Sequence, residues 1–411
     1  MRNRTIIEGR LADIDGVRQG QIVVEQGRIA AVGTGFGRAD YAFGDSCLIF
    51  AGMGDVHIHA REDVTGKEMY KETFATASAA AIHGGVVHVA DMPNNPAAPI
   101  DDASYAAKES HLLKQHLPTI FTLYAGIGPG TNPLSRDVPY KAYMGPSVGE
   151  LYFRSLDDLD RTLASYRGKA VSFHCEDPIL LEKHRGATTH EERRPPECEL
   201  SATRFALAMI EKYGLIGKLC HYSVGEGLPQ IREAKRKGLA VTAEVTPHHV
   251  FFDTAQITPE NRGAMQMNPP LRAPSDREAM LEALRDGTAD YLATDHAPHT
   301  LKEKAKGVSG QPHLDTYGPF AAWLMVEKGF TPERVATICS ANPGQFVAPY
   351  QREKFGRLLP GYIGSLTVLD LKKPVKIERS SLRTKCGWSP FEGITFPGSV
   401  AAVFIAGQRV E

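Results

Sequence analysis

Short apolar runs alternate with helix-like stretches through the middle of the chain. Runs of strand length cover 52–59, 86–92, 119–125, 138–143, 170–175, 217–221, 239–245 and 290–295. Stretches of helical character lie between most of them, at 68–83, 103–115, 156–166, 199–212, 226–237 and 275–285. This alternation predicts an α/β fold, a (β/α)8 TIM-type barrel, with an irregular, short link between the third and fourth strands.

The two ends of the chain have a different pattern, in which short strands are separated by turn residues. Strand-like segments lie at 5–9, 21–26 and 28–32 near the start, and at 364–370 and 400–407 near the end. Two β-rich ends around a different middle predict one small β-sandwich domain made from both. We therefore expect residues 1–50 and 355–411 to form the β domain and residues 51–354 the catalytic barrel.

The charges of the chain are balanced, with 47 Lys and Arg against 48 Asp and Glu. No basic run stands out, so we expect neither nucleic acid nor an anionic membrane surface as a partner. No apolar run approaches the ~18 residues of a membrane span, and the N-terminus does not look like a signal peptide. The six cysteines show no paired spacing, which favours a reduced, cytoplasmic protein.

The first barrel strand carries the most informative polar pattern. Side chains of a strand alternate between its faces, which puts Asp55, His57, His59 and Arg61 on one face. Two imidazoles two residues apart can bind one metal ion, and a guanidinium beside them can hold an anion. The motif alone fits equally well a half-buried strand whose histidines are only hydrogen-bonded.

Polar residues at the ends of the other strands favour the metal site. Asn94, Lys141, His174, His221 and Asp295 each lie at or just after the end of an apolar run. In a barrel these ends meet at one face, where the chemistry takes place. Four imidazoles and a carboxylate suit zinc and exceed one tetrahedral site, so two metal ions are expected. Lys141 is either a surface lysine or, after CO2 adds to its amine, a carbamate ligand.

Many motifs together resemble those of dihydroorotases within the amidohydrolase superfamily. The resemblance extends over nearly the whole chain, with the motifs in family order. They are Asp55-Val56-His57-Ile58-His59-Ala60-Arg61, Met92-Pro93-Asn94-Asn95-Pro96, Lys141-Ala142-Tyr143, Phe173-His174-Cys175-Glu176, Cys220-His221-Tyr222-Ser223, Glu244-Val245-Thr246-Pro247-His248-His249, Met267-Asn268-Pro269-Pro270-Leu271-Arg272, Thr294-Asp295-His296-Ala297-Pro298-His299 and Ser389-Pro390-Phe391-Glu392-Gly393.

The resemblance implies a role for each candidate residue. One zinc ion would be held by His57, His59, carbamylated Lys141 and Asp295. A second would be held by Lys141, His174 and His221. A hydroxide bridging the two ions would be the nucleophile, and Asp295 the general acid and base. The substrate-binding residues would be Arg61, Asn94, Asn268 and His299.

The implied reaction is the reversible cyclisation of N-carbamoyl-L-aspartate to L-dihydroorotate in pyrimidine biosynthesis, so the partner is a small anionic substrate. A homodimer is compatible with the sequence. One alternative is a related cyclic amidase (hydantoinase, dihydropyrimidinase or allantoinase), whose substrates lack the carboxylate that Arg61 and Asn94 would bind. Another is a non-catalytic dihydroorotase-like structural partner, although such proteins typically lose metal ligands.

The chain departs from the family pattern in two places. Glu62-Asp63-Val64 stands where many dihydroorotases have Glu-Pro-Gly, and Gln311-Pro312-His313 stands in a run whose backbone usually contacts substrate. The bulk of His313 puts that backbone contact in doubt. The loop after Lys141 is expected to act as a lid, from which Ser147 would reach the substrate.

Overall fold

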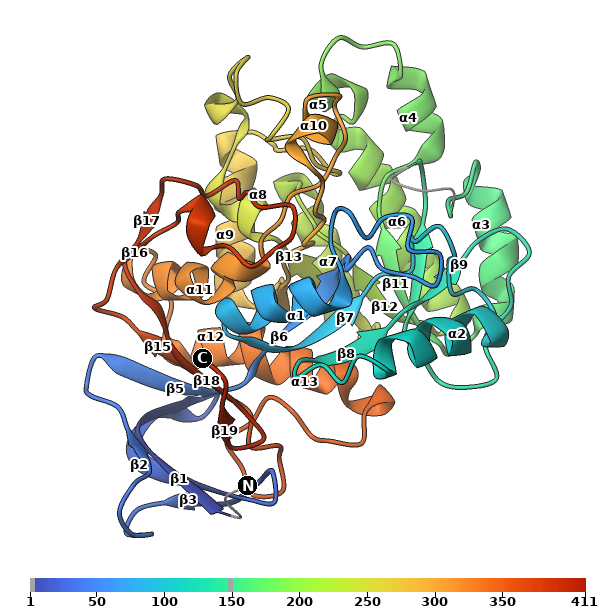
Figure 1. Cartoon of the computed structure of the whole chain (residues 1–411). Helices are drawn as coiled ribbons and strands as arrows, with labels where there is room; N and C mark the ends of the chain where they lie inside the picture. Colours follow the sequence, from blue (N-terminus) through green and yellow to red (C-terminus); the bar gives the residue numbers. More distant parts are fainter. Residues whose placement is uncertain (1–3, 147–150) are drawn as a thin grey trace.

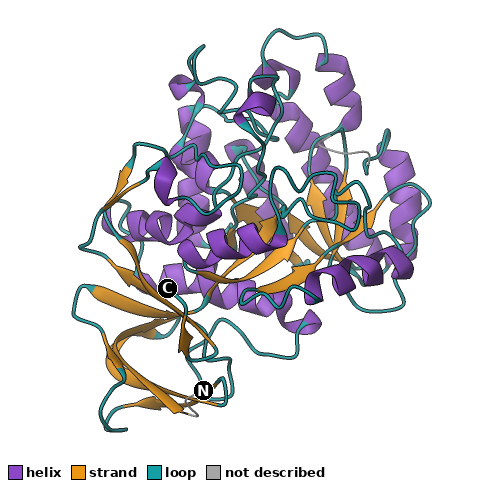
Figure 2. Cartoon of the chain, in the orientation of Figure 1, coloured by secondary structure: helices purple, strands orange, loops and turns teal. Residues whose placement is uncertain are grey.

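The computed structural model describes residues 4–146 and 151–411. The expected contact of Ser147 lies outside the described residues. A barrel of strands surrounded by helices forms the larger part of the molecule, and a separate β sheet lies beside it (Figures 1 and 2). The expected fold class, a (β/α)8 barrel with a β domain, is confirmed.

The barrel strands form a three-stranded sheet, β6-β7-β8, and a six-stranded sheet that runs from β9 to β14. Every registered pair of neighbours is parallel. The strands are β6 (Met53–Ile58), β7 (Val86–Asp91), β8 (Ile120–Leu123), β9 (Ala125–Ile127), β10 (Tyr140–Tyr143), β11 (Ala170–His174), β12 (Ile216–Leu219), β13 (Val241–Val245) and β14 (Tyr291–Leu292).

Two junctions join these sheets. The third expected strand is divided at Tyr124 into β8 and β9, and the Tyr124 N–H donates to the carbonyl of Asp91 at 3.0 Å. On the other side, Ile58 at the end of β6 bridges His296, and the His59 N–H donates to the carbonyl of His296 at 2.8 Å. This second junction brings the residues after β14 against the residues after β6.

Helices follow most of the strands and cover the outside of the barrel (Figure 1). They are α1 (Phe74–His83), α2 (Asp102–Leu113), α3 (Leu156–Leu163), α4 (Pro178–His184), α5 (His190–Arg193), α6 (Pro196–Tyr213), α7 (Leu228–Arg236), α8 (Pro247–Phe251), α9 (Pro274–Asp286), α10 (Leu301–Lys304), α11 (Tyr317–Val326), α12 (Pro332–Ala336) and α13 (Asn342–Val347). The expected start of the first helix at Glu68 is wrong. Thr73 caps α1 by accepting from the Thr76 N–H, so the helix begins at Phe74.

The β domain is an eight-stranded sheet built from both ends of the chain, with the path β19-β18-β15-β5-β1-β2-β3 and β4 beside β1. The strands are β1 (Arg4–Asp13), β2 (Gly16–Glu25), β3 (Arg28–Gly33), β4 (Tyr41–Ala42), β5 (Cys47–Ala51), β15 (Leu366–Asp370), β18 (Ser399–Ile405) and β19 (Gln408–Arg409). Antiparallel pairing of β5 with β15 joins the two ends, next to the start of β6.

Part of the C-terminal segment leaves this sheet. β16 (Val375–Lys376) and β17 (Thr395–Phe396) pair only with each other. The rings of Phe391 and Phe396 lie 5.9 and 6.2 Å from the ring of Phe320 on α11, within the main barrel core. The domain boundaries at 50/51 and 354/355 stay a prediction. None of the helices in the described part of the chain has the length and apolar character that a membrane crossing requires.

Candidate metal and substrate site

A cavity that is open to solvent lies at the carboxyl ends of the barrel strands, and its empty space, with that opening included, is about 370 Å³. Among the described residues, its lining includes every metal ligand and substrate-binding residue that the sequence nominated, with the exception of His299, and four residues that it did not nominate. The lining residues are His57, His59, Arg61, Asn94, Lys141, Tyr143, His174, His221, Asn268, Asp295, Ala297, Ser309 and Gly310. This is the position at which (β/α)8 enzymes carry their active sites.

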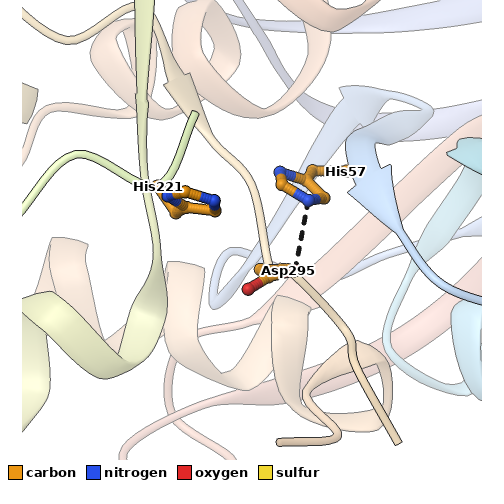
Figure 3. A group of neighbouring side chains, drawn as sticks. All are labelled: His57, His221 and Asp295. Atoms are coloured by element: carbon orange, nitrogen blue, oxygen red, sulfur yellow. Dashed lines mark ion pairs between the residues drawn. The ribbon is translucent and has the colours of Figure 1, made fainter. Parts of the chain in front are cut away.

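Asp295 lies opposite two imidazole rings. His57 Nε2 and His59 Nε2 approach Asp295 Oδ1 at 3.1 and 3.0 Å. With His221, Asp295 and His57 form a buried group whose ligand atoms all lie within 4.8 Å of one another. The three side chains come from separate elements and converge on one space (Figure 3). The donor set of two imidazoles and a carboxylate suits a divalent metal ion.

A second donor set adjoins the first. His174 Nδ1 lies 2.9 Å from His221 Nε2. Lys141 is completely buried, and its Nζ has no hydrogen-bond partner among the described residues. A buried, unpartnered ammonium is costly, whereas a lysine carbamate would supply carboxylate oxygens to a metal ion. The residues present therefore fit a divalent metal centre.

Three residues of the site have left-handed backbone although none is glycine. The φ angles are +58° at Arg61, +37° at His221 and +47° at Asp295. This conformation costs about 1–2 kcal/mol per residue for ordinary side chains, and such strain concentrates at functional sites. The sequence pattern placed Arg61 on the same strand face as His57 and His59. In the structure the strand ends at Ile58, and Arg61 reaches the cavity from the segment that follows.

Burial and neighbouring charges shift the pKa values of this group in opposite directions. Burial by itself would lower the pKa of His57, but the carboxylates of Glu244 and Asp295 raise it well above its ordinary value. Burial would raise the pKa of Asp295, but His57 and His59 hold it well below its ordinary value. Asp295 is therefore an ionised carboxylate at neutral pH, as a metal ligand or proton acceptor must be.

Arg61 supplies an anion-binding group at the other side of the cavity. Its side chain is 2% exposed, and its Nη2 donates to His299 Nε2 at 3.1 Å. Its Nε and Nη1 have no hydrogen-bond partner in the described part of the chain. A buried guanidinium with unused donors favours a carboxylate or phosphate ligand. His299 contacts Arg61 and is not among the lining residues.

The two nominated asparagines differ in their contacts. Asn94 Oδ1 accepts a hydrogen bond from His59 Nδ1 at 2.7 Å, which leaves Nε2 of that ring for Asp295. Asn94 thus orients a candidate metal ligand, a contact that the sequence did not indicate. Asn268 lines the cavity, and its Oδ1 has no hydrogen-bond partner within residues 4–146 and 151–411.

The sequence also missed a backbone wall of the cavity at Ser309 and Gly310. Gly310 has a φ of +129°, and a Cβ there would lie 2.6 Å from the carbonyl oxygen of Ala297, so only glycine fits. His313, the unusual residue of the following run, does not line the cavity. Its Nε2 lies 2.9 Å from His248 Nδ1, so its bulk is accommodated inside the protein.

Comparisons with known proteins identify the family of the chain. Residues 153–410 match the amidohydrolase family. The dihydroorotase of Pyrococcus furiosus is 28% identical over 408 residues, which cover 98% of this chain and 92% of the relative. The dihydroorotase of Halalkalibacterium halodurans is 31% identical over 432 aligned residues, which cover 99% of this chain and 98% of the relative.

A solved structure shares the fold at lower sequence identity. The L-hydantoinase (dihydropyrimidinase) from Arthrobacter aurescens superposes with a TM-score of 0.87 and 23% identity, covering 99% of this chain and 95% of its own. The chain belongs to the amidohydrolase family, and it is a hydrolase of cyclic amides related to the dihydroorotases.

Proposed function

We propose that the chain is a dihydroorotase, which interconverts N-carbamoyl-L-aspartate and L-dihydroorotate in pyrimidine biosynthesis. The buried guanidinium of Arg61 is the observation that carries this proposal, because two of its nitrogens have no partner among the described residues and its side chain lines the cavity. Both proposed substrates carry a carboxylate next to the ring or chain nitrogen, whereas hydantoin carries none. Asn94 and Asn268 complete the proposed substrate-binding group, and His299 contributes by holding Arg61.

The proposed metal centre uses the two donor sets described above. His57, His59, Asp295 and a carbamylated Lys141 would hold one zinc ion, and Lys141, His174 and His221 the second. When bound, divalent zinc supplies an acidified water molecule and polarises the amide carbonyl. The complete burial of Lys141 supports its role, since a surface lysine would reach water. The cytoplasmic location and the homodimer stay predictions.

Asp295 is the proposed proton carrier. Its carboxylate is held ionised by His57 and His59, so it can accept a proton from the attacking water and deliver it to the leaving ring nitrogen. In the direction of ring closure, Asp295 would remove the proton from the carbamoyl nitrogen of the open-chain substrate. Arg61 holds the carboxylate meanwhile, which fixes the reacting carbonyl relative to Asp295.

Assays of the purified, zinc-loaded protein test the proposal. We expect hydrolysis of L-dihydroorotate and cyclisation of N-carbamoyl-L-aspartate, with hydantoin and dihydropyrimidines that lack the carboxylate turned over much more slowly. Activity on hydantoin with none on dihydroorotate would establish a different cyclic amidase. A protein that binds no metal and turns over none of these compounds would instead be a non-catalytic partner.

A further inference from the structure

Glu244 is a buried carboxylate that contacts two of the candidate metal ligands at once. It lies on β13 and is completely buried. Its Oε1 accepts from the ring Nδ1 of His57 and from the backbone N–H of His221, the latter at 3.1 Å. His57 lies on β6, His221 lies two residues after the end of β12, and both belong to the group that includes Asp295. One carboxylate therefore holds a ring on one side of the site and a backbone on the other.

The contact with His57 determines which ring nitrogen faces the cavity. Because Nδ1 donates to Glu244, a neutral His57 ring carries its proton on Nδ1 and leaves the lone pair of Nε2 free. That Nε2 is the atom 3.1 Å from Asp295 Oδ1. A hydrogen bond from the remote nitrogen of a histidine fixes both the tautomer and the ring orientation of a metal ligand.

The contact with His221 bears on the strained backbone of the site. His221 has a φ of +37°, a conformation that ordinary side chains adopt at a cost. Its N–H points to Glu244 Oε1, so the hydrogen bond helps to hold the conformation in which His221 Nε2 reaches His174.

Lys218 compensates the negative charge of the Glu244 carboxylate in the barrel interior. Its Nζ donates to Glu244 Oε2 at 2.5 Å and to the carbonyl of Val56 at 3.2 Å, and the side chain is 2% exposed. The Nζ also lies 5.0 Å from the centre of the Phe346 ring. An unpaired buried carboxylate would be strongly destabilising, whereas a paired one remains an ionised acceptor.

We infer that Glu244, which is paired with Lys218, is a positioning residue that orients His57 and His221 toward the metal centre. This inference rests on the proposed metal centre. A second set of contacts has the same form. His174 Nε2 lies 2.8 Å from Glu176 Oε2, and Arg194 Nη1 donates to the same carboxylate oxygen. His57 and His174, one ligand from each donor set, thus each have one ring nitrogen hydrogen-bonded to a carboxylate. Each of these carboxylates is paired with a cationic side chain.

Two double variants separate positioning from simple charge neutralisation. Lys218→Met/Glu244→Gln removes both charges but keeps an amide oxygen that can accept from His57 and His221. Lys218→Met/Glu244→Leu removes both charges and the acceptor, with a side chain of similar size. The measurement is the zinc dissociation constant of metal-stripped protein, by competition with a chromophoric chelator, alongside urea unfolding of each metal-free variant.

We expect the Leu double variant to bind zinc about 10- to 100-fold more weakly than the Gln double variant, the effect typical of losing a remote partner. Equal zinc affinities in the two variants would overturn the inference. If Glu244 only neutralised Lys218, the two variants, which both lack Lys218, would bind zinc equally well. An unsubstituted protein that binds no zinc would overturn the proposed metal centre itself, so the two failures are distinguishable.

A spectroscopic measurement tests the inference even if the Lys218→Met/Glu244→Leu variant does not fold. In the zinc-loaded, ¹⁵N-histidine-labelled protein, the resonances of His57 are those lost in the His57→Gln variant. We expect the His57 ring proton on Nδ1. A proton on Nε2 would contradict the hydrogen bond to Glu244 and overturn the inference.

Discussion

Nη2 of Arg61 donates a hydrogen bond of 3.1 Å to Nε2 of His299. His299 can accept because burial, with Arg61 beside it, holds its pKa far below its ordinary value, so the ring is neutral. This bond fixes one edge of the guanidinium. The two nitrogens that it leaves, Nε and Nη1, have no partner among the residues that the structure describes, so both remain available to donate to a carboxylate.

Arg61→Met is therefore expected to act on carboxylate-bearing substrates. Hydrogen bonds to charged groups contribute about 1.5–3 kcal/mol each, so kcat/KM for dihydroorotate should fall by about 100-fold or more. Any residual rate on hydantoin should change little, since that ring has no carboxylate. Steady-state kinetics of both substrates, on protein of matched zinc content, check this. An equal fall on both would mean that Arg61 supports the site as a whole.

Lys141→Ala should remove the ligand that the two proposed metal ions share. Lys141 is completely buried, with Tyr143 as its ring neighbour at 5.2 Å. Without a bridging carboxylate, zinc content should fall and turnover should drop by at least about 1,000-fold, the scale of losing a group that acts directly in catalysis. Metal analysis and activity are measured together, and intact mass of the unsubstituted protein under CO2 should show the added carbamate. Unchanged turnover in the variant would exclude Lys141 from the site.

The sequence predicted the barrel strands well because each is a compact apolar run, and six of the eight runs have a polar candidate residue at or just after the end. Tyr124 divides the third strand inside one such run, so no pattern marked the break between β8 and β9. α11 was missed because nearly all of its side chains are buried, and a helix without a polar face has no amphipathic period. The Ala-rich pattern of the first helix was extended back to Glu68, yet the cap lies at Thr73.

The candidate site was predictable where strand ends converge and less so where contacts cross the barrel. His57, His59 and Asp295 follow from the end positions of their strands. The hydrogen bond from His59 to Asn94 depends on how far the segment after β7 turns inward, which the sequence does not encode locally. The position of Glu244 in the sequence did indicate a buried partner, because a carboxylate within the apolar run 239–245 requires one. Only the fold shows that His57 and Lys218 are that partner.

Lys304→Met should loosen the backbone wall of the cavity. Burial lowers the pKa of Lys304 to about 7, and its Nζ donates to the carbonyls of Gln266, Val308 and Gly310 at 2.6, 2.8 and 2.8 Å. Removal leaves buried carbonyls without this donor, which costs about 1–3 kcal/mol of stability. Because Gly310 lines the cavity, KM for dihydroorotate should rise about tenfold.

Lys302→Met provides the matched control for Lys304→Met, since Lys302 is exposed on the same short helix. Urea unfolding and steady-state kinetics of the two variants are compared at one zinc concentration. We expect the Lys302 variant to match the unsubstituted protein in both. A Lys304 variant that loses stability but keeps its KM would mean that this wall does not set the substrate position.

Glu199 gives the protein a buried acid that titrates near neutral pH. It lies on α6 with no exposed surface, accepts from the Ser223 N–H at 2.9 Å, and lies 3.3 Å from Arg272 Nη2. Burial raises the pKa of its carboxyl group to about 7, although Arg272 and Ser223 oppose the rise. The folded state therefore keeps the proton over a pH range in which the unfolded chain, with an ordinary glutamate, releases it.

The sign of the resulting pH dependence follows from proton linkage. Between the unfolded pKa of about 4.3 and the folded pKa, the folded state binds more protons, so the free energy of unfolding falls as pH rises. The contribution of Glu199 is complete below the lower value and is lost by about pH 7 to 8, a change of about 4 kcal/mol. Glu199→Gln lacks this proton. Urea titrations at pH 5.5 and 8 give the free energy of unfolding of both proteins. From the lower to the higher pH, we expect the unsubstituted protein to lose stability relative to the variant. Both proteins are measured after metal removal, so zinc binding does not enter the comparison. A pH-independent difference would mean that Arg272 keeps Glu199 ionised throughout.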